Sequence, residues 1–234
     1  MLKSLATLII SLLIIPFMAV YSTVDGGESR QTGTRQDVKS SSEEQVSEIV
    51  DKLKKRYGGE SFSADFYQES TLAALNISDT AEGRAWFKHP GKMRWEYHMP
   101  DEHAIITDGD TLWIYRPEEN QVVKGDATTY FGDGKGAGFL ANFDLVTESF
   151  DVSLADQTRT HWRMKLVPHE EHYELSAIYL VVNKQSTEIE HVISENIYKD
   201  TTTISFENLS FDGEPDNSLF EFEIPMGTDV ILMD

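Results

Sequence analysis

Histidine and carboxylate side chains are the residues of this chain best suited to metal binding or acid–base chemistry. The segment His169-Glu170-Glu171-His172 resembles the helical signature of zinc proteases. Its two histidines are three residues apart rather than four, and Pro168 beside a predicted strand end favours a hairpin loop. The segment is therefore interpreted as a solvated acidic turn, with a metal site as the alternative. We expect neither a metal nor another cofactor.

The sequence contains no motif for phosphate binding or for nucleophilic catalysis. The glycine-rich segment that begins at Gly132 follows no predicted strand and has no Ser or Thr after Lys135, so it does not match a phosphate-binding loop. No Gly-x-Ser-x-Gly elbow occurs, and no acid–base pair stands out among the 40 Asp and Glu residues. The sequence therefore predicts a protein that is not an enzyme.

Aromatic side chains are concentrated between residues 86 and 115. Strand alternation places Met93, Trp95 and Tyr97 on one face, which points into a barrel or half-barrel. Two interpretations remain open: these residues fill a solid core, or they surround a cavity for an apolar ligand. The residues predicted to line such a cavity are Ala85, Phe87, Met93, Trp95, Tyr97 and Ile114.

These aromatic residues lie within a long series of segments that alternate between apolar and polar side chains, as strands do. One amphipathic helix, over about residues 43–57, precedes the series. Eleven short strands with tight turns describe an antiparallel meander, which has to close, curl or cover its edges. The predicted strands are 62–74, 79–89, 92–98, 103–108, 111–115, 120–124, 149–155, 161–168, 175–183, 187–198 and 201–211.

One long interruption of the meander spans residues 125–148. Its glycine-rich part precedes Phe139, Leu140 and Phe143, which predict a short apolar helix. Long loops inside a compact domain are often lids over a functional site. The alternative is an ordinary crossover whose apolar side chains plug the core.

The composition excludes several classes of protein. A formal charge of −20 disfavours binding to nucleic acid, which depends on Lys and Arg. The absence of Cys excludes disulfide frameworks, thiol nucleophiles, Cys-ligated zinc and acylation of a lipobox cysteine.

The N-terminal region differs from the rest of the chain. Residues 1–22 carry one early charge, Lys3, and an apolar run, which predicts a signal peptide cleaved after Ser22 or after Ala19. An uncleaved membrane anchor is the alternative. Residues 23–42 predict a flexible tether, and residues 43–234 a single domain. We therefore expect an exported protein.

Four segments of the sequence carry a resemblance to a known family. They are Gly83–Tyr97 (GRAWFKHPGKMRWEY), Asp108–Tyr115 (DGDTLWIY) and the flanking segments Ser61–Gln68 and Phe220–Val230. Together they strongly resemble the LolA-type outer-membrane lipoprotein carriers, and Phe220–Val230 resembles the C-terminal strand of that family. The resemblance covers about residues 43–231.

The resemblance implies a mainly β fold: an unclosed antiparallel barrel of about eleven strands, with an N-terminal helix and a short helical lid over an apolar cavity. It implies a periplasmic carrier that takes acylated lipoproteins from an inner-membrane ABC transporter and passes them to an outer-membrane acceptor. We expect a monomer, because a permanent dimer that buried the cavity mouth would block entry of the ligand. A carrier of another lipid or glycolipid, or a periplasmic lipoprotein sensor, is the alternative.

The resemblance also assigns residues to the site. Met93 and Trp95 match apolar positions at the family's cavity, and Phe139, Leu140 and Phe143 match the lid. His89 stands where the family commonly has an Arg that clasps the lid. Because histidine offers fewer N–H donors than arginine, we expect a weaker or pH-sensitive closure.

Overall fold

The computed structural model describes residues 34–131, 138–170 and 173–233, and it describes no side chains for residues 34–41. The predicted signal peptide and the first part of the predicted tether lie outside these ranges, as do Gly132, Lys135 and His172. In the part of the chain that is described, no helix is both long and apolar enough to cross a membrane.

The N-terminal helix α1 spans Thr34–Tyr57. The helix predicted over about residues 43–57 therefore begins earlier, at Thr34, within the predicted tether, because polar residues continue the helix where no apolar face marks its start. The predicted apolar face is confirmed by the burial of Ile49, Val50, Leu53 and Tyr57. Such an apolar stripe holds a surface helix against a core.

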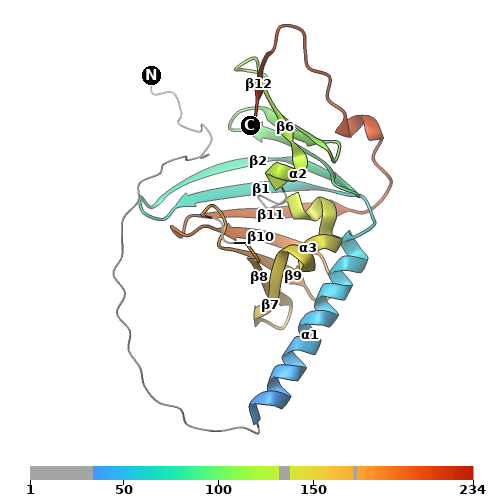
Figure 1. Cartoon of the computed structure of the whole chain (residues 1–234), viewed down its shortest axis with the longest axis vertical. Coiled ribbons are helices and arrows are strands. Elements are labelled where there is room, and N and C mark those ends of the chain that lie inside the picture. The colour runs from blue at the N-terminus through green and yellow to red at the C-terminus, as the bar shows by residue number, and fades with distance from the viewer. Residues whose placement is uncertain (1–33, 132–137, 171–172, 234) are drawn as a thin grey trace.

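Twelve strands form one sheet, in the spatial order β12-β6-β5-β4-β3-β2-β1-β11-β10-β9-β8-β7. All neighbours are antiparallel except β12, which runs parallel to β6. β12 and β7 are the two end strands of the sheet and do not pair with each other, so the barrel is open (Figure 1). The strands are β1 (Phe62–Leu72), β2 (Ile77–Lys88), β3 (Lys92–Met99), β4 (His103–Thr107), β5 (Thr111–Arg116), β6 (Gln121–Asp126), β7 (Phe150–Gln157), β8 (His161–Pro168), β9 (Ala177–Asn183), β10 (Ile189–Glu195), β11 (Thr201–Ser210) and β12 (Asp229–Leu232).

The predicted open antiparallel architecture is confirmed, and the eleven predicted strands correspond to β1–β11. The C-terminal segment differs in detail. Phe220 ends the 3₁₀ helix η2 (Asn217–Phe220), and the added strand β12 follows at Asp229.

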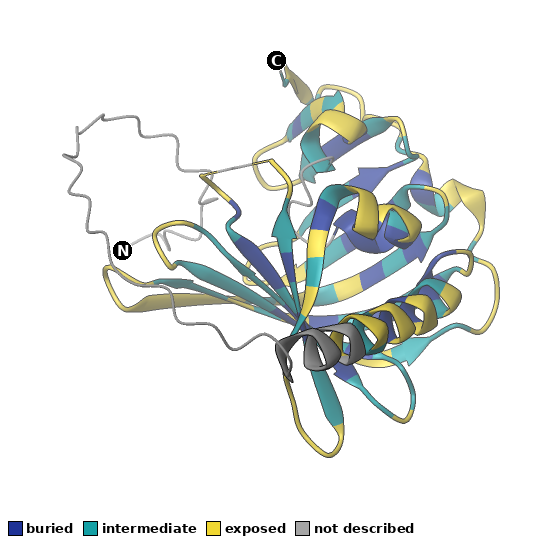
Figure 2. Cartoon of the chain, turned by 60° about the horizontal axis from the view of Figure 1, so that its bottom comes forward, coloured by how far each residue is buried: buried dark blue, intermediate teal, exposed yellow. Residues whose placement is uncertain are grey.

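In the described residues between β6 and β7, three short helices occupy the long interruption of the meander. They are α2 (Ala127–Phe131), η1 (Gly138–Leu145) and α3 (Val146–Ser149). Together with α1 they cover one face of the sheet, here called the concave face (Figures 1 and 2). The opposite face of β4 and β5 is also partly covered, because Phe222 packs against Trp113 and Tyr115. This explains why consecutive residues are buried in β5.

Candidate functional site: the concave face of the sheet

The six predicted cavity residues lie together on the concave face. Ala85 pairs with Trp95, and Phe87 pairs with Met93, across the β2–β3 ladder, so these four side chains are neighbours. All four are 0–4% exposed. Ile114 belongs to the same face because Ile105 connects it to Trp95 through β4. Tyr97 lies further along β3 and is partly buried.

Aromatic rings pack this part of the concave face tightly. Phe87 stacks on Phe62 with ring centroids 4.4 Å apart, and it meets Trp95 edge-on at 5.5 Å. Phe66 meets Trp95 edge-on at 4.8 Å. The indole N–H of Trp95 donates to Met93 Sδ at 3.3 Å. In the structure, most of the predicted cavity residues form part of the buried core.

Further apolar residues of the concave face were not predicted from the sequence. Phe62 and Phe66 of β1 and Phe206 of β11 complete the aromatic cluster. Strands β8–β10 contribute aliphatic side chains to the same face, and their alternation along β9 was the available signal. These are Met164, Leu166, Ile178, Leu180, Val182 and Val192.

The predicted lid residues Phe139, Leu140 and Phe143 are buried in η1. Phe143 contacts Tyr57 at the end of α1, with ring centroids 5.7 Å apart. The hydroxyl of Tyr57 accepts the backbone N–H of Ile189 at 2.8 Å, and burial raises the pKa of this phenol above its ordinary value. η1, which contains the predicted lid residues, and α1 are therefore packed on each other as well as on the sheet.

His89 lies in the turn between β2 and β3, where the lid approaches. Its Nδ1 is buried and has no hydrogen-bond partner among the described residues. The described hydrogen bond between this turn and the lid comes instead from the backbone N–H of Gly91, which donates to the carbonyl of Ala141 at 2.9 Å. A role of His89 as the clasp stays a prediction.

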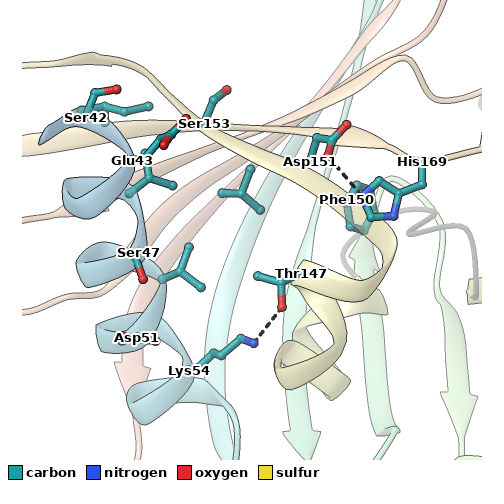
Figure 3. A pocket seen from close by; sticks show the side chains of 14 residues that line it. Ser42, Glu43, Ser47, Asp51, Lys54, Thr147, Phe150, Asp151, Ser153 and His169 are labelled. Carbon is teal, nitrogen blue, oxygen red and sulfur yellow. Dashed lines mark hydrogen bonds and ion pairs between the residues drawn. The ribbon is translucent and has the colours of Figure 1, made fainter. Parts of the chain in front are cut away.

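Two hollows lie next to the concave face. The inner hollow measures about 160 Å³ and includes Met93, Phe131, Phe139 and Phe150 in its lining. The outer groove measures about 700 Å³ and runs between α1 and β7 (Figure 3). Small-ligand pockets typically measure about 300–1,000 Å³, so the inner hollow is too small for a sizeable ligand unless a covering helix moves.

The chemistry of the site is apolar. No group of three His, Asp or Glu side chains suited to a metal occurs among the described residues. His169, the first residue of the predicted acidic turn, has its Nε2 3.3 Å from the exposed Asp151 carboxylate, and the turn itself stays a prediction because residues 171 and 172 lie outside the described residues. Burial raises the pKa of the Tyr97 phenol, and Tyr97 donates to Gln68 at 3.0 Å. The buried apolar side chains of the concave face are of the kind that can cover an apolar ligand.

Comparison with known proteins identifies the family. Residues 58–223 match the family described as "Outer membrane lipoprotein carrier protein LolA". The chain belongs to the LolA family. The matched residues include β1–β11, the short helices between β6 and β7, and η2, whereas α1 and β12 lie outside the match.

Individual relatives agree with this assignment. The chain is 29% identical over 171 residues to an outer-membrane lipoprotein carrier protein of Chromohalobacter salexigens, covering 73% of this chain and 80% of that protein. It is 27% identical to the protein of the same name from Methylobacillus flagellatus, covering 72% and 80%. A crystal structure of an uncharacterised conserved protein from Thermus thermophilus has a similar fold, with a TM-score of 0.53 at 13% identity, covering 81% of this chain and 99% of that one.

Proposed function

We propose that this LolA-family protein carries acylated lipoproteins through the periplasm, from an inner-membrane ABC transporter to an outer-membrane acceptor. The observation that supports the proposal most is the apolar concave face under separate helical covers. Each methylene exposed to water costs about 0.8 kcal/mol, so an acyl chain crosses an aqueous compartment only when an apolar surface covers it. The proposal requires no catalysis.

The predicted cavity residues are proposed to contact the acyl chains. Trp95, Phe87 and Met93 lie at the centre of the concave face, with Ala85, Tyr97 and Ile114 around them. Since the inner hollow holds only about 160 Å³, binding requires that η1 moves away from β2 and β3. Phe139, Leu140 and Phe143 then exchange their contacts with the sheet for contacts with the ligand or with water.

The covers are suited to such movement. Among the described residues, the hydrogen bonds that hold η1 and α3 in place include the one between Gly91 and Ala141 and one of 2.8 Å from Lys54 Nζ to Thr147 Oγ1. Bonds of this kind contribute about 0.5–1.5 kcal/mol each. An acyl chain that replaces the lid on the apolar face offsets their loss.

Mass spectrometry of the protein, purified from its own periplasm without detergent, tests this function. We expect acylated lipoprotein in a one-to-one complex with a monomeric carrier. In a second assay, protein that carries no ligand is mixed with inner-membrane vesicles, and we expect it to release lipoprotein from them. Co-purification of phospholipid or glycolipid alone, together with no release of lipoprotein, would overturn the proposal in favour of a carrier of those lipids.

A further inference from the structure

The outer groove lies between α1 and β7, away from the side chains assigned to the ligand by the sequence analysis. Its volume of about 700 Å³ lies within the range of small-ligand sites. β7 is the last strand of the sheet, so α1 rather than another strand faces it across the groove (Figure 3). The groove therefore lies at the open edge of the sheet.

The floor of the groove is apolar. Val46 and Val50 come from α1, and Phe150, Val152 and Leu154 come from β7. The three β7 residues alternate along the strand and point to its more buried side, whereas Asp151 and Ser153 between them are exposed. Five apolar side chains along two facing elements fit an extended hydrocarbon chain, which needs contact area but no hydrogen bonds.

Phe150 lies between the groove and the inner hollow, because it lines both. On the far side of Phe150, the inner hollow is lined by Met93 and Phe139. The partition is completed by α3, which Thr147 ties to Lys54 of α1 at 2.8 Å. Phe150 and α3 therefore lie between the two hollows.

The rim of the groove is polar and mainly acidic. The carboxylates of Glu43, Asp51 and Asp151 line it, against Lys54 and His169. Lys54 donates to Thr147, and His169 lies 3.3 Å from Asp151. Such a rim repels an anionic phosphate headgroup, and its hydroxyl and carboxylate oxygens accept hydrogen bonds from peptide N–H groups.

We propose that this groove binds one acyl chain of an acylated peptide. The acyl chain lies on the valine side chains of the floor and on Leu154, and its methyl end points past Phe150 towards Met93. The acidic rim favours an acylated peptide over an anionic phospholipid. This inference rests on the proposed function, since it adds an acyl-chain site to the concave face.

A fluorophore placed in the groove tests the site directly. The chain contains no Cys, so a single cysteine can be labelled without side reactions. Ser47→Cys places an environment-sensitive dye on the groove wall, and Glu48→Cys places it on the neighbouring exposed position as the control. Adding a synthetic triacylated peptide without detergent should shift the emission to the blue at position 47 only. The same peptide without acyl chains should shift neither.

A substitution in the groove floor gives a second measurement. Leu154→Asp should weaken binding of the triacylated peptide about tenfold, because a charge replaces an apolar contact. Ala155→Asp, on the exposed side of the same strand, should leave the affinity unchanged. Circular dichroism and urea unfolding of both variants establish that they are folded.

The outcomes separate the two proposals. If the unaltered protein binds no triacylated peptide in equilibrium dialysis, the proposed function fails. If it binds, but the dye at position 47 does not respond and Leu154→Asp binds normally, the groove inference is overturned and the proposed function stands. Equal affinity for lysophosphatidylglycerol would overturn the selectivity assigned to the rim.

Discussion

The concave face has two halves of different chemistry. Strands β1–β3 contribute interlocked rings, with centroid distances of 4.4–5.5 Å between Phe62, Phe66, Phe87 and Trp95. Strands β8–β10 contribute aliphatic side chains such as Leu166, and their half continues to the groove. Rings restrict the geometry of their neighbours, whereas aliphatic side chains repack at little cost. The aromatic half is therefore expected to be the rigid part and the aliphatic half the adaptable part.

The covers of the two halves differ as well. η1 packs against β2 and β3, over the aromatic half, and α1 packs against β7 at the end of the aliphatic half. The two covers meet where Phe143 contacts Tyr57 and where Asp144 approaches Gly58. These contacts, together with the hydrogen bond from Lys54 to Thr147, are expected to couple the movement of one cover to that of the other.

The largest expected effect is on stability in the aromatic half. Phe87→Ala should lower the free energy of unfolding by about 3–5 kcal/mol, because it removes a buried ring from the cluster and leaves a cavity. Ile178→Val, in the aliphatic half, should cost about 0.5–1.5 kcal/mol. Urea unfolding measures both.

Leu75→Ala serves as the surface control, since Leu75 is 66% exposed. It should change stability by no more than about 0.5 kcal/mol. If Phe87→Ala costs no more than Ile178→Val, the aromatic half is not the rigid part and the comparison is wrong.

The junction between the covers is the next target. A side chain at position 58 would place its Cβ within 2.6 Å of the Lys54 carbonyl oxygen and closer still to the Asp144 carboxylate. Gly58→Ala should therefore destabilise the closed arrangement by about 1–3 kcal/mol. Hydrogen exchange should accelerate in η1 more than in β1–β3. Gly59→Ala is the matched control, because a Cβ there meets nothing within 4 Å. Equal exchange in the two variants would show that the covers are not coupled at this point.

A smaller effect is expected at the turn below the lid. Since Nδ1 of His89 is buried without a partner among the described residues, His89→Arg supplies additional N–H donors beside the lid. We expect the closed lid to gain about 0.5–1.5 kcal/mol, which slows hydrogen exchange in η1 and slows ligand release. His98→Arg, at an exposed position of β3, is the control. Unchanged lid exchange and unchanged release in His89→Arg would refute the clasp hypothesis.

The sequence was sufficient to predict the strands and the inward face of β2 and β3, because alternation with period two specifies them directly. It was not sufficient for residues that become neighbours only through the sheet order. Phe206 reaches Trp95 because β11 pairs with β1, a contact between strands far apart in the chain. The start of α1 was missed because propensity alone extends a polar helix where no apolar face marks its boundary.

The smallest effect concerns a titratable group at the end of the aromatic half. The ring of His103 stacks on Tyr97, with centroids 4.0 Å apart, and burial lowers the pKa of His103 below its ordinary value of 6.5. The backbone carbonyl of Asp101, whose oxygen lies 3.1 Å from Nδ1 of His103, acts on the pKa in the opposite direction, and Arg116 adds to the lowering.

The folded state binds the His103 proton more weakly than the unfolded state does. The neutral ring of His103 therefore contributes its full share to the free energy of unfolding above pH 6.5, and this contribution decreases as the pH falls below that value. His103→Phe keeps a ring on Tyr97 but removes the titration. We therefore expect the unfolding free energy of the unaltered protein, compared with that of His103→Phe, to decrease between about pH 8 and pH 5. Parallel pH curves for the two proteins would show that the stack carries no proton-linked stability, and the aromatic half would then be held by packing alone.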